Sequence, residues 1–240
     1  MSESLPKLLE SSLFNATATP AQIREHCQDA IIQRLACVCV APQHVPLAYK
    51  HLLLDTTVEL STVIGQIRLR LSPIERMRLV HEAFAQGVDE LDVFISSPYM
   101  LTKQESDVER EVNALCAAAR EYGKNLRIRI EAGLLTRKPM RDVCKYARNA
   151  GAFAVSVSVS RQSEVDALHN IALIRDAIGP VMRLKVYDPI ATCDRVVKFC
   201  AAGATRIGTP LAGDVLADIP SCRIITYGEG ESSQRDLTAH

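Results

Sequence analysis

Short apolar segments of strand length alternate with longer helix-like segments along almost the whole chain. Two helix starts are marked by Thr19-Pro20-Ala21-Gln22 and Ser72-Pro73-Ile74-Glu75, each with an N-cap hydroxyl, a first-turn proline and a capping-box partner. Glycine follows several helix-like segments, as at Gly87 and Gly123. Leu13–Ala16 is a candidate first strand. Seven further strands are predicted at Leu35–Val40, Thr57–Ile64, Glu90–Ile95, Leu126–Glu131, Ala152–Val159, Val181–Tyr187 and Thr205–Gly208.

This alternation of strands and helices predicts a parallel sheet covered by helices. Eight such units within roughly 210 residues favour a closed (β/α)8 TIM barrel over an open doubly wound sheet. An open sheet is also disfavoured because no glycine-rich nucleotide turn follows the first strand. We therefore predict an α/β protein with one TIM-barrel domain, residues 1–227, and a polar C-terminal tail, residues 228–240.

The balance of acidic and basic residues limits which classes of partner the chain is expected to bind. Lys and Arg number 28, Asp and Glu also number 28, and the sequence pI is about 7.0. No basic surplus supports binding to nucleic acid or to a membrane surface. The longest stretch without Asp, Glu, Lys or Arg, Leu35–Tyr49, has 15 residues, against about 20 for a membrane span. The first fifteen residues carry acids and no apolar core of a signal peptide, so a cytoplasmic location is predicted.

The cysteines and histidines show no pattern of a metal site. Eight cysteines occur, but there is no C-x-x-C pair, and Cys37 and Cys39 alternate within an apolar strand-like run. Reduced, mostly buried thiols in a cytoplasmic protein are therefore predicted. The six histidines have no ligand spacing, and neither a metal nor another cofactor is predicted.

Two charged residues stand inside predicted strands. Lys185 interrupts the apolar run RLKVY, and Asp92 lies within ELDVFI. In a TIM barrel, chemistry is placed at the carboxyl ends of the strands. A buried lysine facing an aspartate there suggests imine formation with proton transfer. These two residues alone are equally compatible with a buried structural salt bridge.

Several motifs, in order and spread from about Ala21 to Leu216, resemble the class I deoxyribose-phosphate aldolases. The family's "GADEVDVV" is similar to Gly87–Val93, and its "GATRIG" stands intact as Gly203–Gly208. Its "SVCVNP", "TVIG" and "IIET-x-LLT" are similar to Cys37–Pro42, Thr62–Gly65 and Ile130–Thr136. The resemblance implies a barrel enzyme that forms an imine between a lysine and an aldehyde.

The resemblance places the family's imine-forming lysine at Ser156, within the strand AFAVSVSV. No lysine lies between Lys145 and Lys185, and a serine hydroxyl cannot form an imine. The family's second lysine matches Lys185, and its proton-relay aspartate matches Asp92. The aspartate of its first strand has no acidic counterpart within Leu13–Thr17.

The resemblance also implies a degenerate phosphate site. The family binds the sugar phosphate through glycine-rich turns, where the backbone N–H groups approach the anion closely. Here one of these glycines is Ser160, and two others are replaced by Asp188 and Pro189. Proline has no N–H to donate. The last turn, which begins at Gly208 and Thr209, loses the family's hydroxyls.

Two functional hypotheses follow. In the first, the chain has lost activity on 2-deoxyribose 5-phosphate and is a binding, scaffold or regulatory protein. Another class I aldolase family binds actin filaments, so a cytoskeletal partner is considered by analogy. In the second, it is an active class I aldolase of altered substrate range that uses Lys185 and Asp92. Arg68 and Arg70 are interpreted as solvated loop residues, with a new anion site as the alternative. The family resemblance makes a homodimer plausible.

Overall fold

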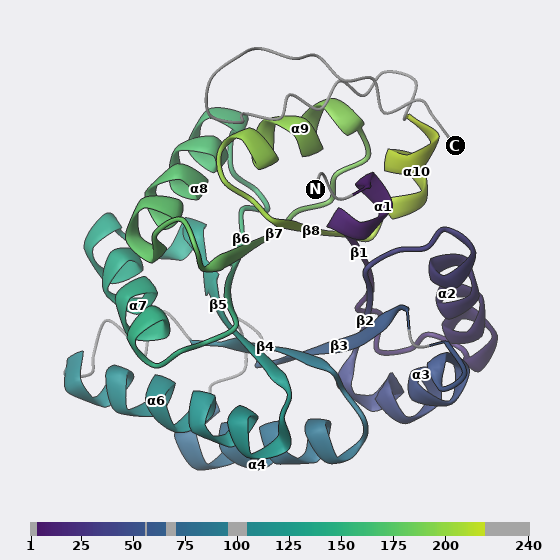
Figure 1. Ribbon diagram of the computed structural model, residues 1–240, viewed down its shortest axis with the longest axis horizontal. Helices are drawn as coiled ribbons and strands as arrows, with labels where there is room; N and C mark the ends of the chain where they lie inside the picture. Colours follow the sequence, from purple (N-terminus) through teal and green to yellow (C-terminus); the bar gives the residue numbers. More distant parts are fainter. Residues whose placement is uncertain (1–3, 56, 66–70, 96–104, 219–240) are drawn as a thin grey trace.

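A computed structural model describes residues 4–55, 57–65, 71–95 and 105–218. Its eight strands form one closed parallel barrel in chain order, and the first strand pairs with the last (Figure 1). The predicted TIM barrel is therefore confirmed. The predicted tail at 228–240 and both loop arginines, Arg68 and Arg70, lie outside the described residues. The strands are β1 Leu9–Leu13, β2 Cys37–Val40, β3 Glu59–Ile64, β4 Glu90–Phe94, β5 Asn125–Glu131, β6 Ala154–Ser158, β7 Arg183–Tyr187 and β8 Arg206–Thr209.

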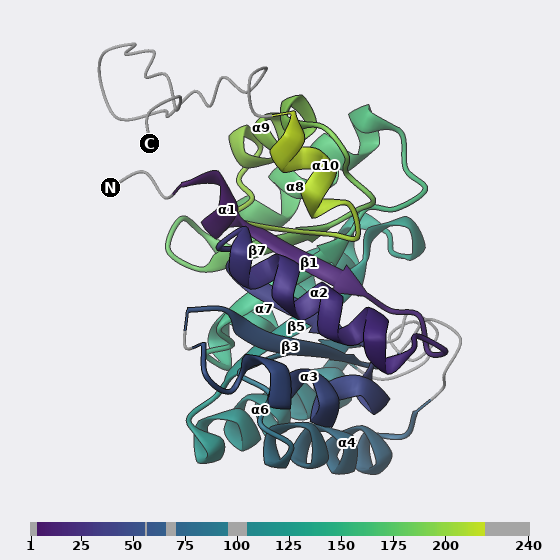
Figure 2. The ribbon, with the colours of Figure 1, turned by 90° about the vertical axis from the view of Figure 1, so that its right-hand side faces the viewer.

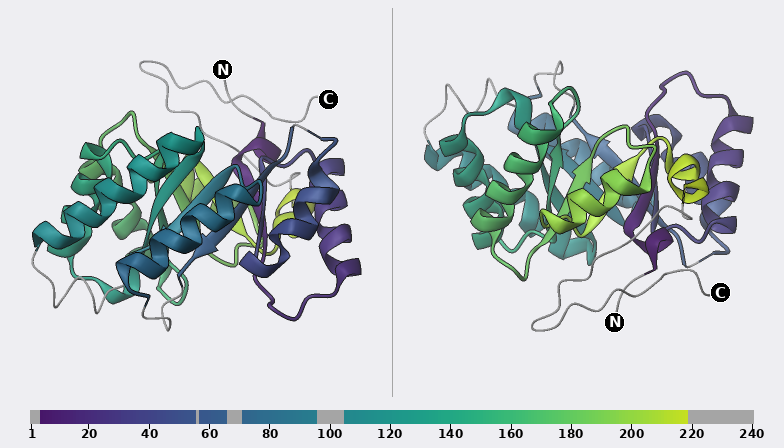
Figure 3. Two further views of the ribbon diagram at one scale, coloured as in Figure 1. Left: turned by 90° about the horizontal axis from the view of Figure 1, so that it is seen from below. Right: turned by 90° about the horizontal axis from the view of Figure 1, so that it is seen from above.

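The helices lie outside the ring of strands (Figure 1). Neighbouring helices pack along one another, as α2 does with α3 (Figure 2) and α4 with α6 (Figure 3). No described helix is long and apolar enough to cross a membrane. The helices are α1 Leu5–Leu8, α2 Pro20–Ile32, α3 Val45–Leu52, α4 Pro73–Ala85, α6 Glu105–Tyr122, α7 Arg137–Asn149, α8 Glu164–Ile178, α9 Cys193–Ala201 and α10 Ala212–Ala217, with short 3-10 turns at Pro42–His44 and Ala132–Leu134.

Both predicted capping boxes are present. The Gln22 backbone N–H donates to Thr19 Oγ1 (3.3 Å), and Gln22 Oε1 accepts from the Thr19 N–H (2.8 Å). Ser72 and Glu75 repeat this arrangement at the start of α4. These bonds satisfy N–H groups that the first helical turn leaves unpaired, which fixes where each helix begins.

The apolar core lies between the strands and the helices, not inside the barrel. Successive side chains of a strand point to opposite faces of the sheet. On most strands the outward-facing members are buried aliphatic residues, and the residues that alternate with them and point inward are mostly charged or polar. The outward set includes Val38, Val40, Leu91, Val93, Ile128, Ile130, Val155, Val157, Leu184 and Val186. The barrel therefore owes its hydrophobic stabilisation to the layer outside the strands, and its interior is polar.

The first strand differs from its prediction. It spans Leu9–Leu13 rather than Leu13–Ala16, and its register sets Glu10 beside Cys37 of β2. The sequence LESSL has no apolar run, so a search for apolar strands misses it. This strand is buried nevertheless because it closes the barrel between β2 and β8.

The cysteines follow their prediction with one exception. Of the seven cysteines in the described part of the chain, six are free thiols, at positions 27, 37, 39, 116, 144 and 200, while Cys222 lies outside it. Burial raises the pKa of Cys27 and Cys116 to about 11 and contributes most to a pKa of about 12 for Cys39, so these thiols are protonated and unreactive at neutral pH. Cys193 is disulfide-bonded, so the prediction of reduced thiols is wrong for this residue.

Candidate active site

Lys185, Ser156 and Arg129 form one row across three neighbouring strands inside the barrel. Strand register sets Ser156 beside Lys185 and Arg129 beside Ser156. All three side chains donate to the same oxygen, Asp92 Oδ2 on β4. The distances to this oxygen are 2.9 Å from Ser156 Oγ, 3.0 Å from Lys185 Nζ and 3.4 Å from Arg129 Nη1. The expected juxtaposition of Lys185 and Asp92 is present, and their catalytic role stays a prediction.

Lys185 is held between two carboxylates. Its Nζ contacts Asp92 on one side and Glu10 of β1 on the other, and its side chain is 1% exposed. Burial and the charge of Arg127 lower the pKa of Lys185, but Asp92 and Glu10 outweigh them, and the pKa lies above its ordinary value. The ammonium form is therefore favoured, and burial alone does not make this lysine a nucleophile.

Arg127 connects three carboxylates from two strands, Glu10 of β1 and both Glu90 and Asp92 of β4. Its guanidinium donates to Asp92, to Glu90 and to Glu10, the last at 3.2 Å, and its side chain is 2% exposed. Burial lowers the pKa of Arg127, but these three carboxylates raise it well above the usual range. Burial raises the pKa of Asp92, but the charges of Arg127, Lys185 and Arg129 lower it by a larger amount, so the pKa lies below its ordinary value. Each charge thus stabilises the ionised form of its oppositely charged neighbours.

Arg206 of β8 extends the set at the amino ends of the strands. Its guanidinium lies 3.4 Å from Glu90 and 3.6 Å from Glu59. Four carboxylates therefore meet four cations in these contacts, with no net formal charge. We call this set the interior charge cluster: Glu10, Glu59, Glu90, Asp92, Arg127, Arg129, Lys185 and Arg206.

Sequence reasoning missed half of this site. The expectation that the first strand lacks an acidic residue is wrong, because β1 begins at Leu9 and carries Glu10. Arg127 and Arg129 alternate with Leu126, Ile128 and Ile130, and this alternation was the available signal. An inward arginine on one strand requires an inward acid on another, because a buried charge needs a partner. Which acid it meets depends on the closed register.

The carboxyl-end rim contains the residues predicted to form the degenerate phosphate site: Ser160, Asp188, Pro189, Gly208 and Thr209. Asp188 follows β7, where its backbone N–H donates to Gly208 O (3.1 Å) and its carboxylate pairs with Arg195 (2.6 Å). Thr209 Oγ1 donates to Ile190 O (2.8 Å) and accepts from its N–H (3.0 Å). Ser160 lies two residues beyond β6, and Pro189 is exposed. The structure thus ties the loop after β7 to β8.

Aromatic and polar groups pack beside the rim. The Arg129 guanidinium lies 4.9 Å from the centre of the Tyr187 ring, which is 5.5 Å from that of Phe14. Ser158 Oγ donates to Glu131 Oε1 at 2.9 Å, and burial raises the pKa of the Glu131 carboxyl. At Gly208 an added Cβ would lie 3.0 Å from Lys185 Cε, so a side chain there would crowd the lysine.

Glu10, Cys37 and Glu90 have possible metal-ligating atoms within 4.8 Å of one another. Both carboxylates are already paired with cations of the interior charge cluster. Burial, together with the charges of Glu10 and Glu90, raises the pKa of the Cys37 thiol well above its usual range. Since a thiol binds a metal as its thiolate, this donor set does not suit a metal ion.

Comparison with known proteins places the chain among aldolases, although no family model matches it. It is 32% identical over 210 residues to a deoxyribose-phosphate aldolase of Geobacillus sp. (strain WCH70), covering 87% of this chain and 93% of that protein. It is 29% identical over 206 residues to that of Caldicellulosiruptor saccharolyticus, covering 85% and 93%. The solved deoxyribose phosphate aldolase of Aeropyrum pernix superposes with a TM-score of 0.77 at 25% identity, covering 90% and 91%. With the barrel and these relatives together, the chain belongs to the deoxyribose-phosphate aldolase family.

Proposed function

We propose that this member of the family does not cleave 2-deoxyribose 5-phosphate and that it acts in the cytoplasm as a binding, scaffold or regulatory protein. The observation that carries the proposal is Ser156. Its hydroxyl occupies the row beside Lys185 and donates to Asp92, and the family resemblance assigns the imine-forming lysine to this position. A hydroxyl adds to an aldehyde only as a hemiacetal, which provides no electron sink for C–C cleavage.

The surroundings of Lys185 support the proposal. Imine formation needs a neutral amine, which attacks the carbonyl carbon before water leaves. Lys185 carries a raised pKa between Asp92 and Glu10, so the neutral amine is scarce at pH 7. Two carboxylates also hold its Nζ away from an incoming carbonyl.

The residues of the carboxyl-end rim also support the proposed loss of activity on 2-deoxyribose 5-phosphate. A carboxylate, Asp188, and a proline without an N–H stand where the resemblance puts glycine turns that hold the phosphate. The Asp188 carboxylate is engaged with Arg195 at 2.6 Å. An incoming phosphate would meet a negative charge and fewer donors, and each missing charge-assisted hydrogen bond removes about 1.5–3 kcal/mol of binding.

Borohydride trapping tests the proposal. The protein is incubated with acetaldehyde and borohydride at pH 7, and the intact mass is measured. We expect no adduct on the wild type and an adduct on Ser156→Lys, the matched positive control. We also expect wild-type turnover of 2-deoxyribose 5-phosphate at background level. A wild-type adduct that maps to Lys185, together with steady turnover, would overturn the proposal.

The second candidate is an active class I aldolase of altered substrate range, with Lys185 as nucleophile and Asp92 as proton relay. The 3.0 Å contact between the two favours it. Lys185→Met separates the candidates, because it must abolish any adduct and any turnover if Lys185 carries the reaction.

The partner in the scaffold role is a protein of unassigned identity, and the actin filament is the candidate by analogy. Co-sedimentation with filamentous actin at physiological salt tests it, with an aldolase known to form the imine as a comparison. Retention in the supernatant would remove actin from consideration. Light scattering of the purified protein tests the expected homodimer.

A further inference from the structure

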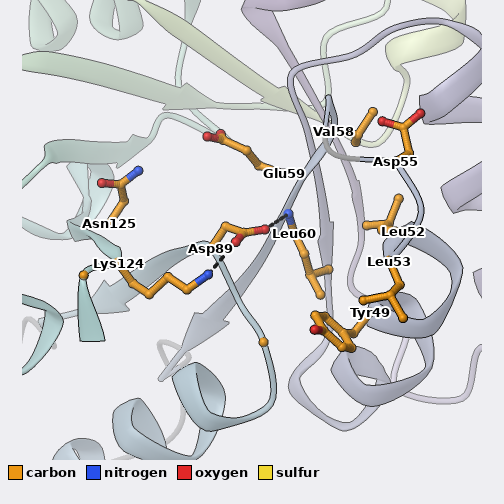
Figure 4. Close-up of a pocket in the computed structure, with 12 residues that line it drawn as sticks. Tyr49, Leu52, Leu53, Asp55, Val58, Glu59, Leu60, Asp89, Lys124 and Asn125 are labelled. Carbon is orange, nitrogen blue, oxygen red and sulfur yellow. Dashed lines mark hydrogen bonds and ion pairs between the residues drawn. The ribbon is translucent and has the colours of Figure 1, made fainter. Parts of the chain in front are cut away.

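A cavity of about 510 Å³ lies at the amino ends of β3, β4 and β5, on the opposite face of the barrel from the carboxyl-end rim. Figure 4 shows polar side chains along one side of it and, apart from Asp55, apolar side chains along the other. The polar side has Glu59, Asp89, Lys124 and Asn125, and the apolar side has Tyr49, Leu52, Leu53 and Val58. The cavity is separate from every residue that the proposed function uses.

The charges that line this cavity do not cancel. Lys124 is engaged with Asp89 at 2.6 Å, and Asp89 also accepts from the Leu60 N–H at 3.1 Å. That pair is therefore internally neutral. Asp55 and Glu59 remain, so the lining itself carries an excess of negative charge when both are ionised, and Arg206, which lies outside the lining and 3.6 Å from Glu59, offsets part of it. An uncharged or anionic occupant gains nothing from this excess, whereas a cation does.

The Glu59 carboxylate is only weakly compensated. Its Oε2 is buried, and in the described part of the chain the nearest cation is Arg206, whose Nη2 lies 3.6 Å away, while a side-chain hydrogen bond joins Glu59 to the Glu90 carboxyl. The charged groups that face it are Glu90 of β4, Arg206 of β8 and Arg127 of β5. Burial and the charge of Glu90 raise the pKa of Glu59 to about 7. The side chain as a whole is 40% exposed, and a donor cation that meets the carboxylate from the cavity would favour its ionised form.

The other side of the cavity suits an apolar body. Tyr49 and Leu53 are 40% and 56% exposed, while Leu52 and Val58 are buried. The Tyr49 ring also packs against Gly87, where an added Cβ would collide with it, so the ring is held in place. A fixed aromatic face beside a carboxylate attracts organic cations by both charge and ring quadrupole.

We propose that this cavity binds a small organic cation, with its ammonium or guanidinium group at Glu59 and its apolar body against Tyr49 and Leu53. The ligand is thus an amphipathic monocation a few carbons long.

Three probes of one shape test the proposal: n-hexylammonium, hexan-1-ol and hexanoate, titrated into the full chain by calorimetry at pH 8. We expect saturable binding of n-hexylammonium, with both other probes at least about tenfold weaker, the lower bound for one charge-assisted hydrogen bond. Glu59→Gln should weaken n-hexylammonium about tenfold or more. Glu25→Gln, on an exposed position of α2, is the matched control and should change nothing.

A measurement on the wild type keeps the test independent of the variants. Because the bound cation favours ionised Glu59, binding near pH 7 should release a proton, seen as a heat that depends on the buffer. The proposal is overturned if the three probes bind alike, if Glu59→Gln binds n-hexylammonium as the wild type does, or if no proton is released. If a lysine-rich peptide binds but n-hexylammonium does not, the proposal is also overturned, in favour of a protein partner.

Discussion

The barrel interior and the carboxyl-end rim hold their charged side chains in opposite ways. In the interior, Arg127 and Lys185 are 2% and 1% exposed, and each meets two or more carboxylates. At the rim, Asp188 meets one cation, Arg195, whose side chain is 31% exposed. Water can replace a partner at the rim but not in the interior. A substitution inside the barrel must therefore preserve the charge balance, whereas the rim tolerates change.

Asp92→Asn should have the largest effect. It removes the carboxylate that Ser156, Lys185, Arg127 and Arg129 all contact, and leaves buried cations short of a partner. We expect a loss of about 3–5 kcal/mol in the free energy of unfolding, measured by urea denaturation. The surface control is Asp176→Asn, since Asp176 is 78% exposed and lies 3.8 Å from Arg141. If both variants lose the same amount, the interior charge cluster is not as tightly coupled as we describe.

Ser156→Lys should come next. It adds a cation beside Lys185 and Arg129, where the cluster is already balanced, and should cost about 2–3 kcal/mol of unfolding free energy. Ser156→Met matches the added volume without the charge, so the difference between the two variants isolates the electrostatic part. Adding Arg129→Leu to Ser156→Lys should recover stability, with a coupling of about 0.5–3 kcal/mol. Strictly additive effects would show that Arg129 does not balance the charge at this position.

Replacing Glu59 should have a smaller effect on the unfolding free energy, and this effect should depend on pH. Its pKa is about 7 in the folded protein, against an ordinary value of 4.5. Between these values the folded state binds a proton that the unfolded state has lost, so stability falls as the pH rises through this window. Glu59→Gln should remove this decline. We expect about 1 kcal/mol, discounted for solvent screening because the side chain is 40% exposed. The unfolding free energy is measured by urea denaturation at pH 5 and at pH 8. If it falls between these pH values by the same amount in the wild type and in Glu59→Gln, the prediction is contradicted.

Asp188→Asn should have the smallest effect. It removes the rim pair with Arg195, which solvent already screens, and should cost about 0.5 kcal/mol. Urea denaturation of Asp188→Asn and Asp92→Asn under the same conditions measures the difference in unfolding free energy between the rim and the interior. A cost comparable with that of Asp92→Asn would mean that the rim is as tightly coupled as the interior.

The sequence was sufficient for the fold and for one contact of the site. Alternating strand and helix patterns predicted the barrel, and mid-strand charges predicted that Lys185 and Asp92 face each other. Glu10 was missed because its strand, LESSL, is polar. The roles of Arg127 and Arg129 were missed because their partners lie on strands far apart in the chain, and only the closed register selects them. The cavity near Glu59 depends on how residues from a helix, three loops and two strands pack, which no local pattern encodes.

The ion pairs between the first strands and the last ones also bear on how the chain folds during its synthesis. Glu10 and Lys185 form an ion pair across 175 positions of sequence. A ribosome delivers Glu10, Asp92 and Arg127 well before Lys185, and buried charges cannot lose their hydration before their counter-ions arrive. Expulsion of water from the barrel interior is therefore a late event, possible only when the seventh and eighth strands, which carry Lys185 and Arg206, have left the exit tunnel. Until then, the growing chain has an open, wet sheet with an unpaired first edge, which is the form that chaperones recognise.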